Sequence, residues 1–65
     1  MIKTSYKMQL SEYYDYHEEI EKDFQKIYPG FRLIRESKDI STNLWVYRVW
    51  FENEKDYTWF ELNQQ

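Results

Sequence analysis

The chain has 65 residues, a formal net charge of −3 at pH 7, 22% aromatic residues and no cysteine. A chain of this size buries only a thin core, so we expect one domain over residues 1–65 that depends on large aromatic side chains. The lack of cysteine excludes disulfides and thiolate metal sites, and no apolar run has the length of a signal-peptide core or a membrane span. We therefore expect a cytoplasmic protein.

The N-terminal residues 2–10 alternate between two kinds of side chain. Ile2, Thr4, Tyr6, Met8 and Leu10 are separated by lysine, serine and glutamine. A period of two residues is typical of a strand with one buried face and one wet face. The pattern predicts a strand here but does not indicate which strand it pairs with.

Residues 11–28 show the spacing of a helix. The apolar face recurs at steps of three and four residues and consists of Tyr13, Tyr16, His17, Ile20, Phe24, Ile27 and Tyr28. Ser11 can serve as the N-cap, and Pro29 stops the helix. We predict one helix from about residue 11 to residue 28.

Three strands are predicted after Pro29 and Gly30, in the segments FRLIRES, LWVYRVWFE and YTWFEL. The expected fold is α+β, with one helix packed on a small antiparallel sheet, element order β-α-β-β-β, and a C-terminal three-stranded meander. Side-chain pairing suggests the register. The expected opposite pairs are Arg32 with Glu52, Ile34 with Trp50, Glu36 with Arg48, Arg48 with Glu61, and Trp50 with Trp59.

Charge is unevenly distributed along the chain: residues 12–30 carry −4 and residues 52–65 carry −3, while 1–11 and 31–51 carry +2 each. On the predicted helix, acidic residues form a stripe opposite the apolar face. Its members are Glu12, Asp15, Glu19 and Asp23, with Glu18 beside it and Tyr14 at its edge. Successive carboxylates would lie about 6 Å apart along the axis, similar to neighbouring phosphates of a nucleic acid. The stripe is also consistent with a plain solvated helix surface.

The outer face of the predicted sheet mixes rings with charges. Trp50, Tyr57 and Trp59 would form an aromatic patch beside Arg48, and such residues dominate protein interfaces. Either this patch binds a partner, or the N-terminal strand or a second copy of the chain covers it. Stacking of single-stranded nucleic acid is a further reading, although the acidic surroundings oppose it.

Catalytic and metal-binding patterns are missing from the sequence. His17 is the only histidine and falls on the apolar side of the predicted helix, where we expect a core residue with one satisfied nitrogen. No residue pattern of an activated nucleophile or of a Ca²⁺ or Zn²⁺ site is present. We expect no enzyme activity, no cofactor and no metal.

In its length, acidity, lack of cysteine and aromatic content, the chain resembles small inhibitors that phages and mobile elements make against host or defence enzymes, among them DNA mimics and anti-CRISPR proteins. The resemblance rests on composition and assigns no role to any residue. With the acidic stripe, it implies a non-enzymatic inhibitor that binds a basic surface of a nucleic-acid-handling protein. Two alternatives remain open: a single-stranded nucleic-acid binder and a self-associating structural module, such as a homodimer.

Overall fold

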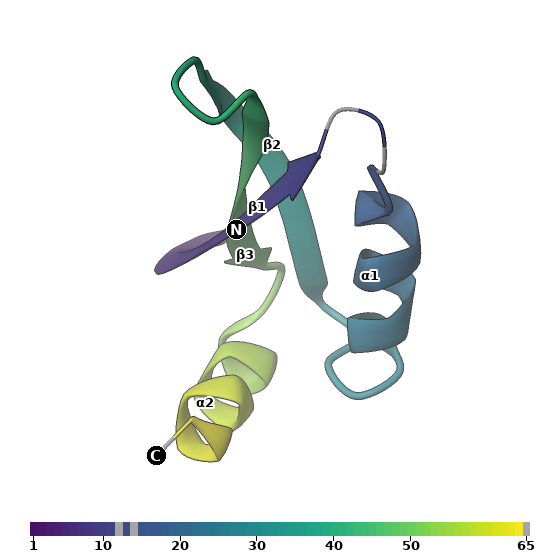
Figure 1. Cartoon of the computed structure of the whole chain (residues 1–65). Coiled ribbons are helices and arrows are strands. Elements are labelled where there is room, and N and C mark those ends of the chain that lie inside the picture. The colour runs from purple at the N-terminus through teal and green to yellow at the C-terminus, as the bar shows by residue number, and fades with distance from the viewer. Residues whose placement is uncertain (12, 14, 65) are drawn as a thin grey trace.

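The computed structural model describes residues 1–11, 13 and 15–64. Within them, strands and helices follow in the order strand, helix, strand, strand, helix (Figure 1). The elements are β1 (Ile2–Ser11), α1 (His17–Gln25), β2 (Phe31–Asp39), β3 (Leu44–Phe51) and α2 (Glu54–Asn63). The predicted α+β class is confirmed. The predicted element order is wrong at the C-terminus, where a helix replaces the expected strand.

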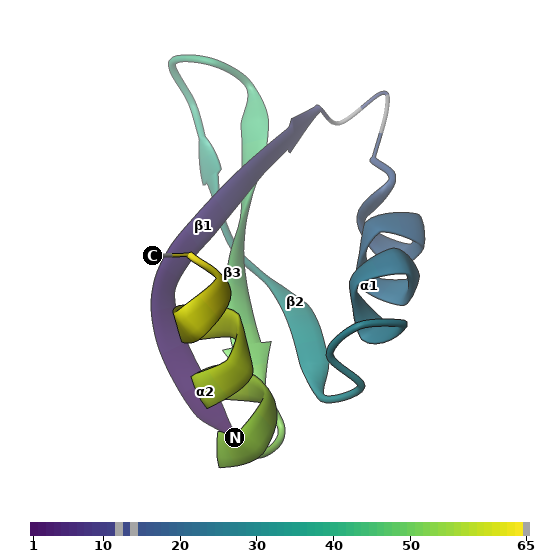
Figure 2. The ribbon, with the colours of Figure 1, turned by 90° about the horizontal axis from the view of Figure 1, so that it is seen from below.

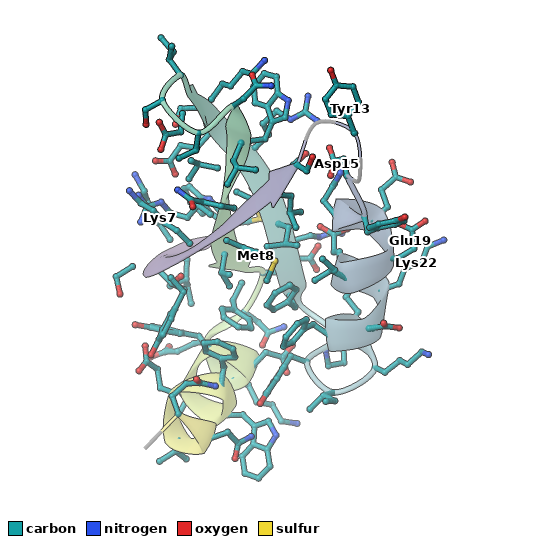
Figure 3. All side chains as sticks on the ribbon, in the orientation of Figure 1. Lys7, Met8, Tyr13, Asp15, Glu19 and Lys22 are labelled. Atoms are coloured by element: carbon teal, nitrogen blue, oxygen red, sulfur yellow. The ribbon has the colours of Figure 1, made fainter. Side chains whose placement is uncertain are left out.

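β1 is an edge strand of an antiparallel sheet in the order β1-β3-β2, so its neighbour is the middle strand β3. The alternating pattern predicted from the sequence is confirmed. Thr4 is buried, and its hydroxyl donates a 2.7 Å hydrogen bond to the carbonyl oxygen of Val49. Lys7 and Met8 extend from opposite sides of the strand, with Lys7 away from the helices (Figure 3). One face of β1 therefore contributes to the core and the other faces water.

The register between β2 and β3 differs by two residues from the predicted one. Arg32 lies opposite Trp50, and Ile34 lies opposite Arg48. Because a shift of two residues keeps every side chain on the same face, the predicted inner and outer faces of β2 and β3 are correct. The predicted charge pairs also form, but diagonally: Arg32 Nε donates to Glu52 at 2.7 Å and Arg48 Nε donates to Glu36 at 2.6 Å.

The C-terminal segment, predicted as a strand, forms α2. Asn53 caps this helix, since its extended backbone precedes the first turn and its side-chain oxygen accepts a 2.8 Å hydrogen bond from the backbone N–H of Asp56. Tyr57 and Phe60 lie three residues apart and turn toward the core on one side of the helix. The predicted pairs of Glu61 with Arg48 and of Trp59 with Trp50 therefore do not exist.

α1 is shorter than predicted because β1 continues to Ser11, which pairs with Leu44. Ser11 is thus not the N-cap. The helix begins at His17, whose backbone N–H donates to Asp15 Oδ1 at 3.2 Å. At the other end, the helix stops before Pro29 as predicted, but it ends at Gln25, three residues earlier than expected.

Aromatic rings fill the space between the sheet and both helices. The buried apolar residues are Tyr28, Phe31, Leu33, Tyr47, Val49, Phe51 and Phe60. Phe24 of α1 stacks on Phe31 at 4.6 Å between ring centroids, and Phe60 of α2 meets Tyr6 edge to face at 5.0 Å. Both helices therefore pack on the same sheet face (Figure 2). In the described part of the chain, no helix covers the other face.

Gly30 makes the close approach of α2 to the turn before β2 possible. Its backbone N–H donates a 2.7 Å hydrogen bond to the buried carboxylate of Asp56. A Cβ at this position would lie 2.8 Å from Asn53 Nδ2 and 2.9 Å from Asp56 Oδ2. The φ of Gly30 is not positive, so the backbone conformation does not require a glycine here. A glycine is required because there is no space for a Cβ.

Candidate functional site

Charge is separated between the helices and the strands. α1 contains four acidic residues and one lysine, and α2 contains three acidic residues and one lysine, so the two helices carry −5. The three strands contain six basic and two acidic residues and carry +4. Because both helices lie on one face of the sheet, much of this separation along the sequence is also a separation in space, although Arg35 and Arg32 reach Asp15 and Glu21 on the helix side. Two candidate binding surfaces result, one acidic and one basic.

The acidic surface consists of Glu18, Glu19 and Asp23, which are all exposed on α1. Glu19 and Asp23 are one helical turn apart, as predicted. Asp23 makes a 3.6 Å ion pair with Lys26, but both side chains are at least three-quarters exposed, so the pair contributes little to stability. The predicted stripe is shorter than expected, because Asp15 precedes the helix. Glu12 and Tyr14 lie outside the described residues.

Asp15 is used inside the molecule, which corrects its predicted role on a free acidic stripe. Its Oδ1 lies 2.7 Å from His17 Nδ1. Its Oδ2 accepts hydrogen bonds from the Tyr47 hydroxyl at 2.5 Å and from Arg35 Nη2 at 2.8 Å. Burial alone would raise the pKa of Asp15, but the hydrogen bonds from Tyr47 and His17 outweigh it and lower the pKa to about 2.

The cluster of Asp15, His17, Arg35 and Tyr47 attaches the start of α1 to the sheet. The imidazole of His17 stacks on the Tyr47 ring at 4.8 Å, and its Nδ1 is bonded as expected. The side chain is only half-buried and lies outside the aromatic core, however, so the expected core position is not observed. Burial and the hydrogen bond to Asp15 raise the pKa of Tyr47, which keeps its hydroxyl protonated as a donor. Sequence reasoning missed Arg35 and Tyr47 because their partners are 20 and 32 residues away.

The basic surface is the uncovered sheet face around Trp50. Lys3 and Arg32 lie opposite Trp50 on either side, and Lys7 lies opposite Arg48 in the next row. The Lys3 ammonium is 5.9 Å from the centre of the Trp50 ring. Arg48 also donates to the carbonyl oxygen of Thr4 at 2.9 Å, so it joins β1 to β3 while its ion pair joins β3 to β2.

Tyr57 and Trp59 are not part of this sheet face, which corrects the predicted aromatic patch. Tyr57 is half-buried on α2, where its ring stacks on Phe51 at 5.9 Å. A hydrogen bond to Glu61 raises the pKa of Tyr57. Trp59 is 52% exposed on another side of α2 and lines an apolar groove with Ile27, Pro29 and Leu62. Only Arg48 and Trp50 of the predicted patch share the sheet surface.

Other kinds of site are not found in the described residues. No group of three or more histidine, aspartate or glutamate side chains there is placed to hold a metal ion. No helix in this part of the chain is both long and apolar enough to cross a membrane. Comparison with protein-family models, with curated proteins and with solved structures found no match for the chain. Functional inference therefore rests on the charged surfaces and on the groove.

Proposed function

We propose that the protein is a non-enzymatic inhibitor or regulator whose acidic surface on α1 occupies a basic surface of a nucleic-acid-handling protein. The observation that carries this proposal is the separation of charge, with −5 on the helices and +4 on the strands. Glu18, Glu19 and Asp23 are all exposed on α1. A field of one sign over one side of a small protein steers it toward a partner of opposite charge.

The position of Asp23 supports a role in binding more directly than the first-turn acids do. Glu18 and Glu19 lie near the helix N-terminus, where negative charge stabilises the helix. Asp23 lies in the last turn, where negative charge is unfavourable, and it repels Glu19 by a few tenths of a kcal/mol. The fold gains little from Asp23, so a carboxylate at this exposed position is better explained by a partner.

The spacing of the acidic surface also suits a basic groove that normally holds nucleic acid. Glu19 and Asp23 are separated by one turn, or about 6 Å along the axis, which resembles the interval between phosphates. Tyr13 and Tyr16 are exposed in the segment just before the helix and add rings near its N-terminus. This combination of anions with adjacent rings imitates a nucleic-acid strand in outline.

A displacement experiment with matched variants tests the proposal. Labelled DNA is bound to each of a panel of nucleases, polymerases and RNA-guided nucleases, and its release by the protein is followed by fluorescence anisotropy over a salt series. For a responding enzyme, we expect Glu19→Gln to weaken inhibition several-fold and to reduce its salt dependence. The control Glu54→Gln removes the same charge from the first turn of α2 and should change neither.

Two outcomes would contradict this proposal. Equal effects of Glu19→Gln and Glu54→Gln would indicate that net charge matters rather than the surface on α1. Failure of the parent protein to release DNA from any member of the panel would remove the proposed class of partner. Circular dichroism of each variant checks that the fold is unchanged.

The basic sheet face favours a second candidate function, the binding of single-stranded nucleic acid. The acidic residue Glu61, which we expected on this face, lies on α2, so the face is more basic than the sequence analysis indicated. Trp50 supplies one ring for stacking, with Lys3 and Lys7 nearby. We expect Lys7→Gln to weaken oligonucleotide binding, with Lys55→Gln on α2 as the control. No binding at micromolar concentration and low salt would exclude this function.

A further inference from the structure

An apolar groove lies between α2 and the turn that follows α1. Ile27 and Pro29 form one wall and Trp59 and Leu62 the other, while Glu54 and Lys55 also line it. The side chains of Ile27, Trp59 and Leu62 are each more than half exposed. Such a cluster of exposed apolar side chains on a small protein marks a contact surface.

The two walls of the groove are held together by hydrogen bonds. Asn63 Nδ2 donates to the Tyr28 hydroxyl at 2.8 Å, and the Gly30 N–H donates to Asp56 at 2.7 Å. Both bonds join α2 to the turn between α1 and β2. The groove is therefore preformed, and filling it requires little rearrangement of the backbone.

An exposed aliphatic side chain lies at the opposite end of the molecule. Ile40, at the tip of the hairpin between β2 and β3, is 93% exposed. The Asp39 carboxylate accepts hydrogen bonds from the backbone and hydroxyl of Ser41, and Asn43 adopts a φ of 60°. These contacts fix the tip, where glycine, asparagine, aspartate and serine are the usual residues. An isoleucine here gains nothing from the fold of its own chain.

We propose that the groove of one copy receives the hairpin tip of a second copy, with Ile40 packed between the two apolar walls. A protruding apolar side chain and a pocket at different places on one molecule make a head-to-tail contact. The tip and α2 lie at opposite ends of the molecule, so one copy can use both at once (Figure 1).

Charge permits the same pairing and disfavours groove-to-groove packing. The hairpin tip carries Lys38 and Asp39, whose charges cancel, whereas the charged residues that line the groove, Glu54, Lys55 and Asp56, sum to −1. Two grooves would therefore repel each other, while a groove and a tip would not. A tip entering a shallow groove buries little area, so we expect a weak contact that appears at high concentration. This assembly is independent of the proposed inhibitory function.

Sedimentation velocity with two complementary variants tests the proposal. At up to about 1 mM, a concentration suited to a contact of about 4 kcal/mol, we expect the parent protein to form species larger than dimers. Ile40→Ser and Leu62→Ser should each remain monomeric, because each lacks one half of the contact. An equimolar mixture of the two variants retains one intact tip and one intact groove and should stop at dimers.

A control variant and two opposing outcomes distinguish head-to-tail assembly from other ways in which the protein could associate. Ile34→Ser removes an exposed isoleucine from the uncovered sheet face and should assemble like the parent. Assembly of Ile40→Ser together with loss of assembly in Leu62→Ser would show groove-to-groove packing and overturn the proposal. A parent protein that stays monomeric at about 1 mM would also overturn it. Ile27→Ser tests the other groove wall if Leu62→Ser alters the circular dichroism spectrum.

Discussion

The two helices pack on the same face of the sheet, but they are attached to it by different kinds of contact. α2 inserts Phe60 into the aromatic core, where it contacts the rings of Tyr28 and Phe51. α1 has no buried residue, and polar contacts support its half-buried rings. The comparison shows that a thin core can fix one helix by burial, whereas the other needs directed hydrogen bonds to hold its position.

The polar attachments of α1 also protect an edge of the sheet. Glu21 Oε2 accepts a 2.8 Å hydrogen bond from the Leu33 N–H, and Gln25 Nε2 donates a 2.9 Å bond to the Phe31 carbonyl. These backbone groups belong to β2, an edge strand, and would otherwise be open to pairing with another chain. The same two side chains therefore hold α1 in position and occupy backbone hydrogen-bonding groups at the edge of the sheet.

Truncation of Phe60 should have the largest effect, because it removes the main apolar anchor of α2. We expect Phe60→Ala to lower the free energy of unfolding by about 3 to 4 kcal/mol. For a domain of this size, such a loss approaches the whole stability. Urea titration followed by circular dichroism measures it. Trp59→Ala, on the exposed side of the same helix and studied at low concentration, should change stability much less. Similar losses in both variants would contradict the assigned burial.

Gly30→Ala should have the next largest effect and should also act on α2. The added Cβ would displace Asn53 and Asp56, which cap the helix and tie it to the turn before β2. We expect a loss of about 2 kcal/mol in the free energy of unfolding. Asn53→Ala combined with Gly30→Ala should cost less than the sum of the single changes, since both disturb the same cap. Additive losses would show that the glycine acts elsewhere.

Asp15→Asn should weaken the attachment of α1 in a pH-dependent way. The pKa of Asp15 is lower in the folded protein, at about 2, than its ordinary value of 3.8. Hence the charged carboxylate stabilises the fold fully above about pH 4, and this contribution is lost as the pH falls toward about 2. Near pH 6, we expect Asp15→Asn to cost about 1 to 2 kcal/mol.

The pH profile separates this role from a general loss of packing. The stability difference between Asp15→Asn and the parent should shrink as the pH is lowered from about 5 to about 2. Thermal denaturation at each pH measures the difference. Phe60→Ala, which acts through burial, should show no such convergence. A difference for Asp15→Asn that stays constant over this range would contradict the electrostatic attachment of α1.

The smallest effect is expected for Glu21→Ala, which leaves the Leu33 N–H without its acceptor at the edge of β2. We expect a loss of about 1 kcal/mol and faster hydrogen exchange at the Leu33 amide. Glu21→Gln keeps an acceptor oxygen and should largely preserve the protection. If both variants exchange alike, the carboxylate's charge and its ion pair with Arg32 would be the important feature instead.

The sequence patterns located the three strands and the centre of α1, but not the limits of that helix. Ser11 satisfies the rules for an N-cap, yet it pairs with Leu44 in the sheet. The acidic surface was accordingly predicted in part: Glu18, Glu19 and Asp23 are exposed on a helix, whereas Asp15 is bound by Arg35, Tyr47 and His17. Whether a carboxylate is free or bound depends on residues far along the chain, which local periodicity does not reveal.

By itself, the sequence determined which side chains of each strand face the core. The alternation of inward and outward side chains is the same whether β2 and β3 pair in the predicted register or in the observed one, two residues away. The sequence also determined the separation of charge, since acidic and basic residues occupy different segments. Only the tertiary structure decided that YTWFEL is a helix, because a short apolar run suits either a strand or a helix. The choice was made by the space beside Gly30, the Asn53 cap and the burial of Phe60, which together moved Trp59 from the sheet to the groove.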